Sequence, residues 1–183
     1  SAEDVLVAEE ISSFYIEGLH AVVLPRHSRM SLAASATEQA TWIAIHSGEV
    51  WIDPGGSGGA RWVVSNDESP VSIEKSRSRI AVARTDTGLG ITALSDSIRL
   101  SSGLGSAHRV RVGEEWKNGA IALNARIASL QSQLTSHRPG ERSVFVATCD
   151  AEDIARGRWS LSTGVLDQER AGTLRARTGN VRL

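Results

Sequence analysis

The residues of this chain that could carry chemistry are a single cysteine, a short acidic cluster and five scattered histidines. Cys149 follows the apolar run Ser143 to Thr148, and a cysteine at the end of such a strand is usually a small core residue. His108 and His137 are available as partners, but nothing in their spacing places either of them beside the thiol. We therefore predict no catalytic residue, and we favour a non-enzyme while leaving enzyme activity open.

The acidic cluster consists of Asp150, Glu152 and Asp153, which could bind a metal or act as general acids. Their spacing is equally that of the first turn of a helix, where carboxylates stabilise the positive end of the helix dipole. With one cysteine the chain forms no internal disulfide, which leaves the redox compartment open. We therefore predict no metal site and no cofactor.

The overall charge is close to neutral, because 20 Lys and Arg residues are balanced by 21 Asp and Glu residues. This balance gives no reason to expect nucleic acid or an anionic membrane as the main partner. No apolar run approaches the roughly 18 residues of a membrane span, and no signal peptide opens the chain, so we expect no membrane insertion. We take the cytoplasm as the default location, and we leave open whether a leader or an anchor preceded Ser1.

A ten-residue pattern occurs three times and sets the expected fold. In each copy, two short apolar runs flank a turn of Ser or Thr with Gly or Asp, and the copies span residues 43–52, 91–100 and 174–183. Alternating runs around a two-residue turn predict a β-hairpin, in which Ile45 would face Val50 and Gly48 would supply a positive φ. Because turn signals also recur roughly every 8 to 12 residues, we predict an all-β antiparallel fold, a jelly roll, barrel or sandwich.

The sequence period changes between Glu114 and His137, where apolar residues recur at intervals of three and four. Acidic residues open this stretch, and bases, Pro139 and Gly140 close it, as at the two ends of a helix. We predict one long helix in the C-terminal half, although Gly119 costs about 1 kcal/mol relative to Ala within a helix and would favour a later start. The expected organisation is a β domain over 1–112, with a helix and hairpin over 113–183 packed on the same domain.

Three tryptophans and three arginines are the candidate partner-binding residues: Trp42, Trp51, Trp62, Arg175, Arg177 and Arg182. In the first predicted hairpin, Trp42 and Trp51 share the face opposite the apolar core positions, so that face needs the predicted helix or another subunit as a cover.

In the last predicted hairpin, Arg175 would lie opposite Arg182. An anionic partner would relieve this repulsion, and the acidic first 18 residues are the nearest candidate, unless both side chains extend into water. These features predict a protein partner or a homo-oligomer.

The order of elements between His20 and Asp96 resembles the first part of a cupin. A strand ends at Pro25, the run 45–52 stands where cupins have an apolar strand leading into Gly-Glu, and Asn66 opens a turn where cupins show Gly-Asp. The paired histidines and glutamate of metal-binding cupins are absent, since Arg26-His27-Ser28-Arg29 stands near the expected place. The resemblance therefore implies a jelly roll that holds no metal and that binds a sugar or a small acid.

A second stretch, Ile91 to Gly113, is similar to a repeat of the periplasmic domain of ferric-citrate-type sigma regulators, which also reads apolar strand, turn, apolar strand. That resemblance implies a signalling module that binds another protein and has no chemistry of its own.

Taken together, the sequence predicts a non-catalytic binding or assembly module on a cupin-like β scaffold. The alternatives are a metal-free small-molecule binder or enzyme, and a periplasmic signalling domain. A ligand domain should have a polar cavity between its sheets, whereas an assembly module should have a filled core and an apolar patch outside.

Overall fold

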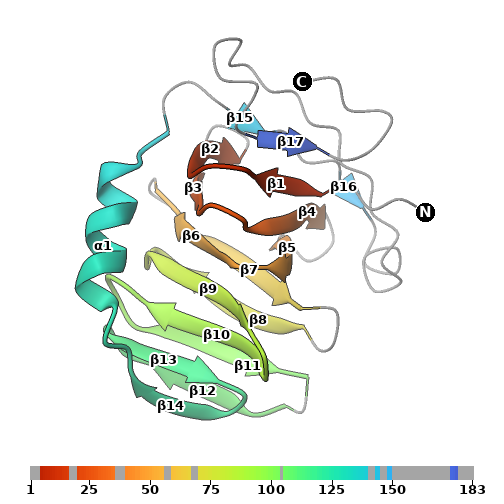
Figure 1. Cartoon of the computed structure of the whole chain (residues 1–183). Helices are drawn as coiled ribbons and strands as arrows, with labels where there is room; N and C mark the ends of the chain where they lie inside the picture. Colours follow the sequence, from red (N-terminus) through yellow and green to blue (C-terminus); the bar gives the residue numbers. More distant parts are fainter. Residues whose placement is uncertain are drawn as a thin grey trace.

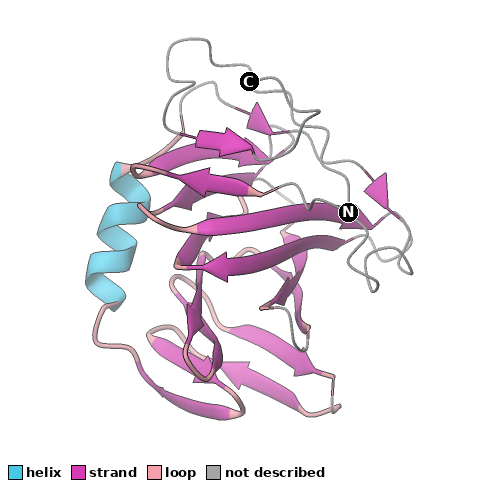
Figure 2. Cartoon of the chain, turned by 45° about the vertical axis from the view of Figure 1, so that its right-hand side comes forward, coloured by secondary structure: helices cyan, strands magenta, loops and turns pink. Residues whose placement is uncertain are grey.

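The computed structural model describes residues 5–16, 20–35, 40–55, 59–66, 70–103, 105–139, 143–144, 148–149 and 174–176. In these residues two β-sheets face each other across an apolar core, and a helix lies against the outer face of one of them (Figure 1, Figure 2). The predicted all-β fold class is therefore confirmed, in the form of a sandwich.

The first sheet is ordered in space as β12 (Ala107–Val110), β11 (Ile98–Ser102), β8 (Val71–Ser76), β7 (Ala60–Ser65), β5 (Ala40–Ser47), β4 (Arg29–Ser35), β1 (Leu6–Ala8) and β17 (Leu174–Ala176), with β16 (Thr148–Cys149) also beside β4. The second sheet is ordered as β14 (Ala120–Leu123), β13 (Glu114–Lys117), β10 (Gly88–Ala93), β9 (Ile80–Thr85), β6 (Glu49–Asp53), β3 (His20–Leu24), β2 (Ser12–Ile16) and β15 (Ser143–Val144). Most neighbours are antiparallel, whereas β5 runs parallel to β7, β15 to β2 and β16 to β4.

The core follows from the alternation of side chains along the strands. Val50 and Ile52 of β6 point between the sheets into the main apolar cluster. Trp51, between them, points to the outer face, where it packs with Leu130 and Leu134 of the helix α1 (Ile127–Ser136). The helix thus covers the outer face of the second sheet.

The first two copies of the ten-residue pattern are not hairpins, which corrects the sequence prediction. β5 pairs with β4 and β7, whereas the next strand, β6, pairs with β3 and β9, so the chain crosses from one sheet to the other at Gly48. The second copy crosses in the same way between β10 and β11. In a sandwich, two strands that turn apolar faces to one core can belong to facing sheets as well as to one sheet, and alternation alone does not distinguish these cases. The third copy is described only over Leu174–Ala176, and its remainder lies outside the described residues.

A buried serine holds each crossing. At the first crossing, Ser28 Oγ accepts a hydrogen bond of 3.1 Å from the Glu49 amide, and a Cβ on Gly48 would lie 2.9 Å from the Ser28 Cα. Since Gly48 also has φ +75°, this position requires glycine. At the second crossing, Ser78 Oγ donates to the Asp96 carbonyl at 2.7 Å and accepts from the Asp96 amide at 3.1 Å.

The predicted long helix is correct in its second half and wrong in its first. α1 has ten residues, and the preceding stretch is the hairpin β13–β14, in which Trp116 pairs with Ile121. Its turn residues Asn118 and Gly119 have φ +46° and +91°, the two positive values that a type I′ hairpin turn needs and a right-handed helix excludes. The glycine that seemed costly in a helix is the residue that closes the hairpin.

Candidate functional site

The three tryptophans predicted to bind a partner lie in different parts of the sandwich. Trp51 and Trp62 are 2% and 1% exposed; Trp51 is covered by α1 and Trp62 belongs to the main core. Trp42 is half-buried on the outer face of the first sheet, because its neighbours Ile43 and Ile45 point into the core. The expectation that Trp42 and Trp51 share one face is therefore wrong, since their strands belong to different sheets. Trp42 is the one of the three that reaches the surface.

The arginines of the last predicted hairpin are described only in part. Arg175 lies in β17, where its backbone pairs with Val7 of β1, within the acidic first 18 residues. Its side chain, together with Arg177 and Arg182, lies outside the described residues. The charged docking edge stays a prediction.

His20 and His46, two histidines of the stretch 20–96, make separate local contacts. His20 Nδ1 lies 2.6 Å from the Pro54 carbonyl oxygen, and its ring packs edge-on against Trp62 at 5.2 Å. His46 Nε2 lies 2.8 Å from Ser31 Oγ, on the other sheet. Within the described residues, no three His, Cys, Asp or Glu side chains gather in a way that could hold a metal ion.

An exposed apolar strand closes one end of the second sheet. All four residues of β14 are exposed, with Ile121 40% and Leu123 84% exposed, and the nearby Val112 is 46% exposed. β14 pairs with β13 on one side, and no described strand pairs with its other side. Its sequence Ala-Ile-Ala-Leu carries no charge. Unpaired backbone groups and uncharged apolar side chains together make this edge able to accept another strand.

Two side chains of β14 lie on the core-facing side of the second sheet but outside the buried core. Trp116 belongs to the main core, and Ile121 lies directly opposite it on β14 and hence on the same side of the sheet. Leu123, two residues later, continues that side. Ile121 and Leu123 thus lie on the core-facing side of the sheet and are nevertheless exposed.

The segment between β14 and α1 is tied down at several points. The Asn124 amide donates to the Gly113 carbonyl at 2.8 Å, and Asn124 Nδ2 donates to Thr92 Oγ1 at 2.9 Å. Arg126 donates two hydrogen bonds, of 2.8 and 3.2 Å, to the carboxylate of Glu49. The hydrogen bond to Glu49 is the main cause that raises the pKa of the Arg126 guanidinium above its usual value, so the guanidinium stays charged. The edge strand is therefore presented by an anchored segment.

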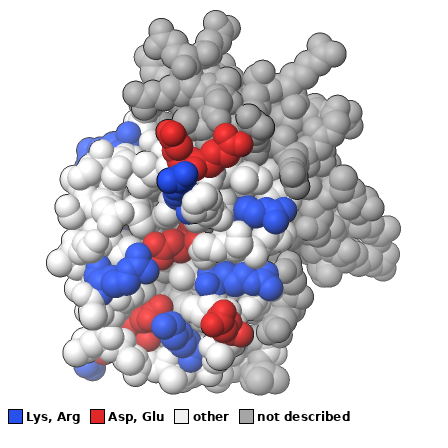
Figure 3. Space-filling model, viewed as in Figure 1, with Lys and Arg blue, Asp and Glu red and all other residues white. Residues whose placement is uncertain are grey.

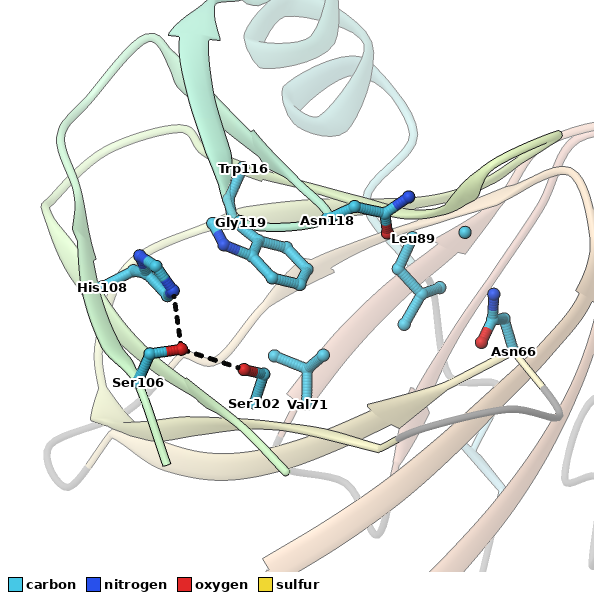
Figure 4. A pocket seen from close by; sticks show the side chains of 10 residues that line it. Asn66, Val71, Leu89, Ser102, Ser106, His108, Trp116, Asn118 and Gly119 are labelled. Atoms are coloured by element: carbon cyan, nitrogen blue, oxygen red, sulfur yellow. Dashed lines mark hydrogen bonds between the residues drawn. The ribbon is translucent and has the colours of Figure 1, made fainter. Parts of the chain in front are cut away.

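A pocket of about 330 Å³ opens at the same end of the sandwich, between the two sheets (Figure 4). Ten residues line it: Asn66, Val71, Gly88, Leu89, Ser102, Ser106, His108, Trp116, Asn118 and Gly119. They come from strands of both sheets and from the turns that join them, including the β13–β14 turn.

Charges of both signs are mixed over the surface. On the face shown in Figure 3, the Lys and Arg side chains of the described residues lie interspersed with Asp and Glu. The ion pairs include Arg79 with Asp53 at 3.0 Å and Lys117 with Glu115 at 3.1 Å. The described residues on that face therefore form no broad area of one sign of the kind that attracts nucleic acid. In the described part of the chain, no helix is both long enough and apolar enough to cross a membrane.

Sequence reasoning missed both the exposed edge and the pocket. The signal for the edge was present in the Asn118-Gly119 pair followed by four apolar residues without a charge, which is a hairpin signature. The pocket had no sequence signal, because its residues are spread from Asn66 to Gly119.

Comparisons with known proteins give a fold likeness. No protein-family model and no curated protein matches this chain. A solved structure described as a candidate anti-sigma factor from Parabacteroides distasonis is similar, with a TM-score of 0.50 and 14% identity over 67% of this chain and 60% of that one. A second structure of the same description has a TM-score of 0.49 with the same identity and coverage. The match thus spans about 60% of the length of that neighbour, and at this identity the likeness shows the fold: a β-rich domain like that of a candidate anti-sigma factor.

Proposed function

We propose that this chain is a non-catalytic regulatory module that binds another protein, and that β14 is the edge on which the partner docks. The observation that carries the proposal is the exposure of all four uncharged residues of β14 at the end of an otherwise well-packed sheet. The fold likeness to a candidate anti-sigma factor supports a regulatory role, as does the resemblance of residues 91–113 to a sigma-regulator repeat.

The expected mode of binding is the addition of a strand. An extended segment of the partner would form main-chain hydrogen bonds with the free edge of β14, and its alternate side chains would cover Ile121 and Leu123. Those two residues already lie on the core-facing side of the sheet, so a partner strand would extend the core of the sandwich across the interface. The backbone contacts would provide affinity, and the packing on the two apolar side chains would provide specificity.

The alternatives predicted from the sequence fit the structure less directly. The main core between the sheets is filled with apolar side chains, as expected of an interaction module, and the polar pocket of about 330 Å³ lies at one end of the sandwich rather than at its centre. A second copy of the chain could also supply the added strand, which would make the module a homo-oligomer. The experiment below separates this case from a different partner.

Site-specific photo-crosslinking tests the docking edge. A photoreactive amino acid at position 123 should crosslink to one discrete protein in the cells that encode the chain, whereas the same group at Ala107 should not. Ala107 is the matched control because it is exposed on β12, the last strand of the other sheet.

The captured protein would then be purified and titrated against the wild type and an Ile121→Lys variant. Weaker binding by the variant supports the proposal, and the mass of the product shows whether the partner is a second copy. No product from position 123, an equal product from position 107, or unchanged binding by the variant would each contradict it.

A further inference from the structure

The pocket between the two sheets is separate from the free backbone edge of β14 and has a chemistry of its own. We propose that it binds a small uncharged molecule rich in hydroxyl groups, of the size of a single sugar ring. This inference is independent of the protein partner proposed above. It rests on the arrangement of polar groups in the pocket, on a buried indole N–H, and on the absence of full charges among the lining residues that the structure describes.

One wall of the pocket carries a connected row of polar side chains. His108 Nε2 lies 3.2 Å from Ser106 Oγ, which lies 3.3 Å from Ser102 Oγ (Figure 4). A hydroxyl group can donate one hydrogen bond and accept two, so each serine in this row keeps capacity for a ligand. Because the three side chains already position one another, they offer a ligand hydroxyl a preformed set of donors and acceptors.

The indole of Trp116 adds a donor without a partner in the described part of the chain. Trp116 is 4% exposed, and none of the described residues accepts a hydrogen bond from its buried Nε1. The centroids of the Trp116 and His108 rings lie 6.0 Å apart. Figure 4 shows the indole nitrogen on the side of the ring that faces His108. Leaving a buried donor unsatisfied is unfavourable. Because this nitrogen has almost no accessible surface, we expect a small shift of the Trp116 or His108 ring on binding, which would let a ligand oxygen accept its hydrogen bond.

Three other indoles, those of Trp42, Trp51 and Trp62, also have a buried Nε1 that pairs with no described residue. Trp116 differs from them because its ring lines this pocket. An indole N–H without a described partner therefore does not by itself identify a ligand site, and the row of polar side chains beside Trp116 is what distinguishes this pocket.

The remaining walls favour an uncharged ligand with an apolar side. Val71 and Leu89 form the apolar part, and Asn66 and Asn118 bring amide groups, with Asn118 held by a hydrogen bond to the Thr87 carbonyl. No described lining residue is Asp, Glu, Lys or Arg. A carboxylate or a phosphate would lose its hydration here without a Lys or Arg to compensate, whereas hydroxyl groups would exchange water for Ser, His, Asn and Trp.

The size of the pocket narrows the class further. Its volume of about 330 Å³ lies at the lower end of the range of roughly 300 to 1,000 Å³ that is usual for ligand sites. A single ring with hydroxyl groups fits that space better than a nucleotide or an oligosaccharide. The aliphatic face of such a ring would lie against Val71 and Leu89, and its hydroxyl groups would meet the polar wall.

Indole ¹⁵N–¹H NMR on the full chain tests the proposal directly. The probes are glucose, galactose and N-acetylglucosamine in one arm, and acetate and citrate in the other, each titrated into the millimolar range. We expect at least one sugar to shift the Trp116 indole signal in a saturable way while the Trp51 signal stays in place. A saturable shift with the acids alone, or no shift with any probe, would overturn the inference.

Paired variants identify the groups that bind. Ser106→Ala, at an exposed position in the β11–β12 turn, should weaken sugar binding by about tenfold through the loss of a hydrogen bond, whereas Ser97→Ala, just before β11 and outside this pocket, should not. Trp116→Phe keeps a ring and removes the N–H, and Trp51→Phe is its control because that indole is also buried and unpartnered.

An equal loss of binding in a variant and its control would contradict the proposed site. If Trp116→Phe does not fold, the serine pair still decides the question. Leu123→Lys, which targets the docking edge, should bind the sugar as the wild type does, so failure of the sugar site and failure of the docking edge can be told apart.

Discussion

Two strands, β12 and β14, end the two sheets at the same end of the sandwich, and they are built differently (Figure 1). β12 carries Arg109, which is exposed and donates to Ser97 Oγ at 3.2 Å. β14 carries no charge, and its Leu123 is 84% exposed. Charged side chains on an edge strand discourage pairing with other chains, and an uncharged apolar edge invites it. The comparison indicates that one edge is protected and the other is available.

The protection of β12 extends to its neighbour β11. Arg99 of β11 lies directly opposite Arg109, and Glu74 of β8 lies 4.0 Å from Arg99. Two like charges opposite each other weaken a strand pair, but in exposed positions the cost is small because water screens them. This pair shows within the described residues the arrangement that the sequence predicted for Arg175 and Arg182.

The largest effect should come from charging the available edge. The double variant Ile121→Lys with Leu123→Lys should weaken binding of the crosslinked partner by more than about 100-fold, roughly 3 kcal/mol, because the added strand would have to bury two ammonium groups. The stability of the chain itself should change by less than about 0.5 kcal/mol, since both changes increase polarity at exposed positions. Calorimetric titration and thermal unfolding measure the two quantities. Unchanged affinity would show that the partner binds elsewhere.

An intermediate effect should follow from disturbing the turn that carries β14. Gly119→Ala places a side chain at φ +91°, where a Cβ has open space but the backbone conformation is unfavourable. We therefore expect the free energy of unfolding to fall by about 1 kcal/mol or slightly more. Hydrogen exchange should become faster in β13 and β14 and stay unchanged in β12. Gly103→Ala, in the β11–β12 turn, is the matched control, because it also meets open space and has no positive φ. Equal effects of the two changes would refute this account of the turn.

The smallest effect should come from removing the charge that protects the other edge. Arg109→Val should raise self-association at high protein concentration, because β12 would then present apolar side chains and free backbone groups. The free energy of self-association should become more favourable by less than about 1 kcal/mol, and sedimentation would show this as a shift toward dimers. Arg109→Lys keeps the charge and should behave as the wild type. If Arg109→Val also behaves as the wild type, the arginine does not protect the edge.

The sequence alone predicted the local features of this protein correctly where they depend on neighbouring residues. Alternation and frequent turns indicated an all-β fold, and the apolar spacing around Leu130 and Leu134 indicated a helix. The positive φ of Gly48 was also predicted, because a tight turn after Ser47 needs it. These features depend on steric rules and side-chain periodicity that act within a few residues.

The tertiary structure decided which strands pair and which apolar residues are covered. Alternation specifies the face of a strand that is buried and leaves its partner open, so 43–52 could have formed a hairpin. Two serines hold the crossings between the sheets instead. Ser28 lies 21 residues before Glu49, and Ser78 lies 18 residues before Asp96, so neither contact belongs to the ten-residue pattern itself.

Coverage of apolar residues was decided at the same level. The helical pattern placed Leu123 on a buried face, yet it is the most exposed of the described large apolar residues, whereas Trp51 is covered by α1. Burial depends on which elements meet in space, and that information is distributed over the whole chain rather than over any one stretch of it.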